Sequence, residues 1–172
     1  MLPLREATLH NHKKAEQMAF NVKMFKGELS QKQYLAYLEQ QHAIFKVIES
    51  KGLPNSSLSR LDAVTQDIQE LVVKGNSRSD LTKTTEEYTS YLKELNANTI
   101  LPHVYLNYLA IAFGGQIMKK KVPSSGKMYS FENKKEAIQS VRDVQKDEWA
   151  EEVNRAYEYL IGIFNDLEKI ES

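Results

Sequence analysis

The chain has no cysteine among its 172 residues. Its absence excludes disulfide bonds, thiolate catalysis and zinc or iron–sulfur sites that are held by cysteine. The chain also lacks net charge, because Lys and Arg together number 23 and Asp and Glu together number 23. A protein that binds nucleic acid normally shows a basic excess or a basic face. We therefore expect no nucleic-acid partner.

Long apolar runs are absent as well, and none approaches the roughly 20 residues that are needed to cross a bilayer. The first eight residues include Arg5 and Glu6 and lack the apolar core of a signal peptide. We therefore expect a cytoplasmic protein with no membrane partner. A length of 172 residues with 41% apolar residues suits a single domain that spans residues 1–172.

Proline and glycine are scarce, with four and seven residues, and apolar residues recur at helical spacing along nearly the whole chain. The pattern predicts an all-α fold without strands. Ser30 is typical of a helix N-cap, and Asn98 or Thr99 is expected to cap a later helix that holds Pro102 in its first turn and ends before Pro123. The other expected helices cover residues 2–24, 31–49, 61–75, 80–95, 134–144 and 149–170.

Only four histidines are present, so any transition metal would be held by one of them or by carboxylates. His12 and Glu16 have the i,i+4 spacing at which two side chains meet on a helix. A histidine that ligates iron usually donates its second N–H to a carboxylate, a carbonyl or water. On spacing alone, a solvated surface pair remains the more common case. Glu39 and His42 have the Glu-x-x-His spacing of helical di-iron sites, but these sites need two such pairs and the chain offers one.

Gly114 and Gly115 form a pair inside an apolar helical run. Each glycine in a helix interior costs about 1 kcal/mol relative to alanine, and glycine pairs are a known cause of kinks. The alternative is a helix that ends there with a glycine cap. The residues that follow, from Gln116 to Lys120, still have a helical pattern, which favours a kink. Arg5 and Arg142 could pair with carboxylates of an anionic ligand, although each alone is more typical of an ordinary surface charge.

These residues resemble a known family. The stretch from Leu4 to Glu16, and the Lys26–Gly27 step after it, resemble the proximal helix of haem oxygenases. The stretch from His103 to Lys120 resembles their distal helix, and the segment 163–167 also fits. The resemblance implies an all-α, single-domain, multihelical haem-oxygenase-like fold. In that fold, haem is sandwiched between a proximal helix and a kinked distal helix.

Carried over by position, His12 matches the proximal iron ligand, and Glu16 matches the carboxylate that binds its free nitrogen. Gly114 and Gly115 match the glycines that let the distal helix bend over the haem. The implied reaction opens haem, which is both cofactor and substrate, to biliverdin with release of CO and ferrous iron. It consumes O2 and electrons from a reductase or ferredoxin.

The resemblance also implies residues at the edge of the haem. Arg5 and Tyr105 match positions near the haem propionates, and Arg142 matches a basic propionate partner. The expected electron donor is a soluble protein of the ferredoxin or flavodoxin type, and the family default is a monomer. A basic docking surface could come from five lysines, although solvated lysines are the alternative reading: Lys13, Lys14, Lys119, Lys120 and Lys121.

The distal segment departs from the pattern of animal and many bacterial members. They carry Gly-Asp-Leu-Ser before the two glycines, whereas this chain has Ala110, Ile111, Ala112 and Phe113. The missing aspartate holds a water network that delivers protons, so a drier distal side with a bulky Phe113 is expected. Plant-type members also lack this aspartate and resemble the chain more closely here. An active haem oxygenase is therefore the main hypothesis, and a protein of the same fold that binds haem or a bilin without degrading it is the alternative.

Overall fold

The computed structural model describes residues 1–170, and the regular elements in that range are all helical. This confirms the predicted all-α class. No helix in this range is long and apolar enough to cross a membrane. The α-helices are α1 (Leu4–Ala7), α2 (Leu9–Glu16), α3 (Ala19–Phe25), α4 (Gln31–Lys51), α5 (Leu61–Val73), α6 (Lys83–Lys93), α7 (Leu101–Lys121), α8 (Lys134–Val144) and α9 (Ala150–Glu168). Short 3-10 turns are η1 (Ser56–Leu58), η2 (Lys127–Tyr129) and η3 (Asp147–Trp149).

The prediction of one continuous helix over residues 2–24 is wrong, because three short helices occupy this stretch. Thr8 separates α1 from α2 with φ −111° and ψ 2°, and its hydroxyl donates to the Leu4 carbonyl at 2.9 Å. Such local side-chain bonds compete with the helical ladder. Met18 takes an extended conformation with ψ 133°, which separates α2 from α3. The N-terminal segment therefore changes direction twice while it follows α9.

Helix α4 begins where the sequence predicts. The Ser30 hydroxyl accepts from the Gln33 backbone N–H at 3.1 Å, and the Gln33 side chain accepts from the Ser30 N–H at 2.9 Å. This reciprocal capping box satisfies two backbone donors that the first turn would otherwise leave unpaired. The helix then runs 21 residues through the core, where Leu35, Leu38 and Ile48 are fully buried.

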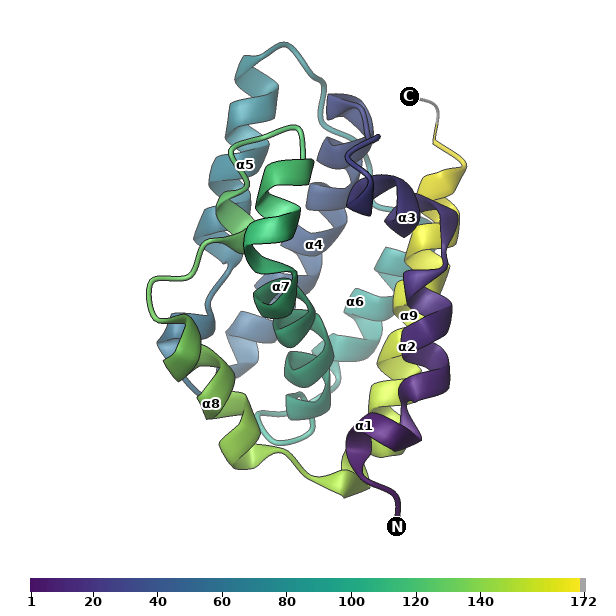
Figure 1. The fold of residues 1–172 in the computed structure, drawn as a ribbon, viewed down its shortest axis with the longest axis vertical. Helices are drawn as coiled ribbons and strands as arrows, with labels where there is room; N and C mark the ends of the chain where they lie inside the picture. The colour runs from purple at the N-terminus through teal and green to yellow at the C-terminus, as the bar shows by residue number, and fades with distance from the viewer. Residues whose placement is uncertain (171–172) are drawn as a thin grey trace.

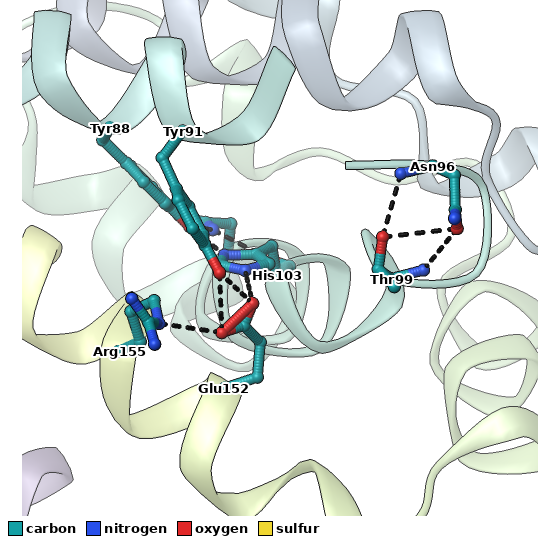
Figure 2. Close-up of polar contacts among 8 residues, drawn as sticks. Tyr88, Tyr91, Asn96, Thr99, His103, Glu152 and Arg155 are labelled. Carbon is teal, nitrogen blue, oxygen red and sulfur yellow. Dashed lines mark hydrogen bonds and ion pairs between the residues drawn. The ribbon is translucent and has the colours of Figure 1, made fainter. Parts of the chain in front are cut away.

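The predicted cap of α7 is wrong, because Ile100 is the N-cap and no side chain bonds to this helix end. Asn98 and Thr99 instead belong to a turn that precedes the helix. The Asn96 side-chain oxygen accepts from the backbone N–H groups of Asn98 and Thr99, each at 2.9 Å, and Figure 2 shows the bond from Thr99. Pro102 does lie in the first turn of α7, as expected.

The C-terminal helix α9 packs against the N-terminal helices α2 and α3. It also packs against α6 and α7 (Figure 1). Its Phe164 stacks on Phe20 of α3 and on Tyr37 of α4, with ring centroids 6.2 and 6.3 Å apart. Helices α2 and α7 both pack against α9, so residues that are about 100 positions apart in sequence share one neighbouring helix.

Candidate functional site

His12 lies on α2 with half of its side chain exposed, at 50%. Its Nε2 contacts the carboxylate of Glu16 one turn later, so the pair expected from the spacing is formed. Its Nδ1 lies 3.0 Å from the hydroxyl of Tyr157 on α9. Both ring nitrogens therefore have an oxygen partner. Tyr157 was not predicted, because 145 residues separate it from His12 and no local spacing indicates the contact.

Tyr157 of α9 lies beside residues of both α2 and α7. It is only 7% exposed, and its ring stands edge-on to the His12 imidazole with the planes at 86°. Burial raises the pKa of Tyr157 well above its usual value, and the neighbouring Tyr105 of α7 and Glu16 of α2 raise it further. The hydroxyl therefore keeps its proton at neutral pH and can donate or accept a hydrogen bond.

The glycine pair in α7 produces the predicted kink. Gly115 has φ 38° and ψ −131°, which is not helical, and helix continues on both sides of it. This backbone conformation is open to glycine and strained for other residues. A Cβ at Gly115 would also stand 2.7 Å from the amine of Lys134, whereas one at Gly114 would stand 3.0 Å from the Met118 side chain. The interpretation as a kink is confirmed, and the alternative of a glycine cap is wrong.

One face of α7 near the kink is apolar and exposed. Phe113 and Ile117 are 58% and 59% exposed, and Ala110 on the same face is also exposed. The i, i+3 spacing of Ala110 and Phe113 places them in one apolar stripe along the helix, whereas Ile117 lies beyond the non-helical Gly115. Ile111, which stands at the position of the missing aspartate, is only 4% exposed and belongs to the hydrophobic core. Large exposed apolar side chains in a contiguous stripe are typical of a binding surface.

The three residues expected near propionates lie in elements at one end of the molecule, namely α1, the start of α7 and the end of α8 (Figure 1). Arg5 is exposed on α1, which is a separate helix from α2, so the seven-residue spacing from Arg5 to His12 does not place them on one helical face. Tyr105 meets Trp149 edge-on with ring centroids 6.5 Å apart. The guanidinium of Arg142 lies 5.5 Å from the Phe113 ring, which brings α8 to the apolar stripe.

A second polar cluster links α6, α7 and α9 (Figure 2). The fully buried His103 approaches the Tyr88 hydroxyl through Nδ1 at 2.7 Å and the Glu152 carboxylate through Nε2 at 3.2 Å. Glu152 also accepts from the Tyr91 hydroxyl and pairs with Arg155 at 3.0 Å. Burial lowers the pKa of His103, so the ring is neutral at pH 7. This cluster was not predicted from the sequence.

In the alternative metal pair, Glu39 with His42, the carboxylate of Glu39 bonds to Arg78. Glu39 is nearly buried and accepts two hydrogen bonds from the Arg78 Nε at 3.0 and 3.2 Å. Among residues 1–170 no three histidine, aspartate or glutamate side chains gather as a carboxylate-rich metal site requires. The hypothesis of a di-iron site at this pair therefore has no support in the fold of the described residues.

Comparison with solved structures defines the class of fold. Heme oxygenase-1 from the cyanobacterium Synechocystis, solved in complex with heme, superposes with a TM-score of 0.79 over 96% of this chain and 90% of that one, at 21% identity. Heme oxygenase from Leptospira interrogans superposes equally well, with a TM-score of 0.79 over 94% of this chain and 96% of that one, at 23% identity. The all-α architecture described above is therefore the haem oxygenase fold.

Sequence comparison then identifies the family. The family model described as heme oxygenase matches residues 2–166. The chain therefore belongs to the haem oxygenase family, as its two helix motifs suggested. Among curated relatives, heme oxygenase 2 of Macaca fascicularis is 24% identical over 96% of this chain. The chain spans 64% of the length of that relative.

Proposed function

We propose that the protein binds haem between α2 and α7, with His12 as the axial ligand. The observation that carries the proposal is the pairing of a half-exposed imidazole on α2 with an exposed apolar stripe and a glycine kink on α7, both on helices that rest on α9. A flat apolar macrocycle with one metal suits these two faces, because the first supplies a nitrogen ligand and the second supplies apolar contact. Two of the structural neighbours, both from Synechocystis, were solved in complex with heme.

We propose further that the protein degrades haem to biliverdin, CO and ferrous iron, using O2 and external electrons. When bound, haem would supply both the O2-activating iron and the carbon atoms that are oxidised. Phe113 and Ile117 would exclude water from one face of the macrocycle. Gly114 and Gly115, without Cβ atoms, would let the backbone approach that face closely.

Proton delivery on the side of α7 would differ from that of members with the distal aspartate. Ala110 is exposed but has no proton donor, and Ile111 is apolar and buried. The backbone at Gly115 is not helical, and backbone groups turned out of the helix there could hold a water. We infer that water on this backbone, rather than a carboxylate, delivers protons.

The charged residues around the site would orient an anionic ligand and an electron donor. Arg5 and Arg142 are exposed cations, and Tyr105 supplies a hydroxyl at the same end of the molecule. Carboxylates such as propionates would be held by these groups. The exposed Lys13 and Lys14 of α2, with the lysines that end α7, would favour docking of an acidic electron carrier such as a ferredoxin or flavodoxin.

Titration with hemin tests the binding proposal. The wild-type protein should give a Soret band and spectrum of a histidine-ligated haem, and His12→Ala should lose that species. His10→Ala is the matched control, because His10 is an exposed histidine on the same helix and should leave the spectrum unchanged. A wild-type spectrum that His12→Ala leaves intact would remove His12 as the ligand.

Turnover tests the enzymatic proposal. Addition of ascorbate, or of ferredoxin with its reductase, to the haem complex in air should replace the Soret band with the absorbance of biliverdin. A Soret band that persists under reductant and O2 would reject the enzymatic proposal and leave a haem-binding protein.

A further inference from the structure

We propose that Tyr157, rather than Glu16, is the hydrogen-bond partner that His12 keeps when its ring binds iron. Tyr157 would then be a positioning residue for the axial ligand, and Glu16 would be displaced. This inference rests on the proposed function and adds to it the identity of the group behind the ligand. It differs from what the family resemblance implies, because the resemblance assigns that part to the carboxylate of Glu16.

The starting observation is that both imidazole nitrogens of His12 already have partners. Nε2 contacts the Glu16 carboxylate, and Nδ1 lies 3.0 Å from the Tyr157 hydroxyl. A histidine binds iron through one nitrogen and usually donates the N–H of the other to an acceptor. One of the two contacts must therefore break when the metal arrives, and the other remains to fix the rotation of the ring.

The two partners differ in how easily they can leave. The Glu16 side chain is 61% exposed and sits on the same short helix as His12, so its carboxylate can rotate into water. Tyr157 is 7% exposed on α9, the helix against which α2 and α7 both pack. Withdrawal of its hydroxyl would require movement of a buried ring in a close-packed region, where such movement is costly. Glu16 is therefore the contact that breaks.

The same geometry decides which nitrogen is accessible to a planar macrocycle. Nδ1 is the ring nitrogen nearer the backbone, and it faces the buried Tyr157 edge-on at a plane angle of 86°. Nε2 is the outer nitrogen, and its partner within residues 1–170 is the exposed Glu16 carboxylate. A haem can reach Nε2 after Glu16 moves aside, whereas Nδ1 stays covered by α9. With Nε2 taken by iron, Nδ1 would keep the proton and would donate a hydrogen bond to the Tyr157 oxygen.

This arrangement has a chemical consequence. A neutral phenol oxygen accepts a weaker hydrogen bond than a carboxylate does, so the axial imidazole gains less negative character. The strength of the iron–histidine bond then depends on the Tyr157 hydroxyl and hardly at all on the charge of Glu16. The iron–histidine stretching frequency of the ferrous protein, measured by resonance Raman spectroscopy, reports this bond without any turnover.

The test compares Tyr157→Phe with Glu16→Gln in the full chain loaded with hemin. Tyr157→Phe keeps the ring and removes only the hydroxyl. It should lower the stretching frequency and weaken hemin binding about tenfold, the lower end of the range for loss of a partner behind a metal ligand. Glu16→Gln should leave the frequency unchanged and change the hemin affinity less than twofold. Tyr159→Phe, which removes a hydroxyl from the same helix α9, is the control and should match wild type.

A frequency that shifts in Glu16→Gln as much as or more than in Tyr157→Phe would overturn the inference and assign the role to the carboxylate. An unchanged frequency in Tyr157→Phe would also overturn it. Thermal unfolding without haem shows whether Tyr157→Phe remains folded. Failure of the proposed function itself is distinguishable, because in that case the wild-type protein would give no histidine-ligated species at all.

Discussion

Removal of the Tyr88 hydroxyl is a sharp test of the polar cluster between α6, α7 and α9. This buried hydroxyl donates to Nδ1 of the neutral His103 at 2.7 Å, and it accepts from the Asn107 side-chain amide at 3.0 Å. His103 can then donate its Nε2 proton to Glu152 at 3.2 Å. Each ring nitrogen of His103 thus has a partner, and the Tyr88 hydroxyl is the only partner of Nδ1 found in residues 1–170.

The structure sets the expected magnitude for Tyr88→Phe. The ring would keep its stacking on Tyr159, with centroids 4.6 Å apart, so apolar burial would be unchanged. The loss is that of a buried acceptor, His103 Nδ1, left without its hydrogen bond, which costs roughly 1–3 kcal/mol. For a domain of this size, 1 kcal/mol lowers the Tm by roughly 2–4 °C. We therefore expect a fall of roughly 2–12 °C.

The assay is urea and thermal unfolding of the haem-free protein at pH 8, followed by circular dichroism. Tyr34→Phe is the matched control, because Tyr34 is equally buried and its hydroxyl has no hydrogen-bond partner within the described part of the chain. This control should be neutral or slightly stabilising, since it removes an unpaired buried polar group. Equal losses of stability in the two variants, or no loss in Tyr88→Phe, would refute the assignment of this cluster as a stabilising network.

Two further predictions concern the kink and acid stability. Gly115→Ala should lower the free energy of unfolding by roughly 1–3 kcal/mol, because alanine is strained at φ 38° and ψ −131°; Gly114→Ala, at a position without positive φ, should cost less in the same urea assay. Burial lowers the pKa of His103 and of His42, so below about pH 6.5 the unfolded chain binds protons that the folded chain does not. Stability should therefore fall between pH 8 and pH 5.5, and His103→Gln should flatten part of this slope; a slope that is unchanged in this variant would contradict the argument.

Much of the fold follows from sequence because its determinants are local. Capping at Ser30 and helical periodicity over 134–144 predicted the start of α4 and both ends of α8. Gly115 was identifiable because a glycine pair inside an apolar helix has a specific backbone consequence. The breaks at Thr8 and Met18 were not predicted, since threonine and methionine occur within many helices and the side-chain bond from Thr8 to Leu4 is one of several that the residue can form.

In the candidate site, too, contacts within one helix were predictable and contacts between helices were not. The contact of His12 with Glu16 was expected because both residues lie on one helix at i,i+4 spacing. The contact of His12 with Tyr157 depends on how α9 packs against α2, and no pattern within either segment indicates it. The cluster of His103 with Glu152 is hidden for the same reason, because 49 residues separate the two. Local pairs are visible in sequence, whereas partners across helices require the packed structure.

The burial of Ile111 links the missing aspartate to the packing of α7. At 4% exposure, this side chain contributes to the core on the face opposite the exposed stripe of Ala110 and Phe113. A carboxylate there would be buried in an apolar environment, where an unpaired charge is strongly disfavoured. Asn107, one turn earlier, uses its amide to bond Tyr88 and the His103 carbonyl. The buried face of α7 therefore stabilises the fold. Any chemistry at α7 must rely on its exposed face and on the backbone at Gly115.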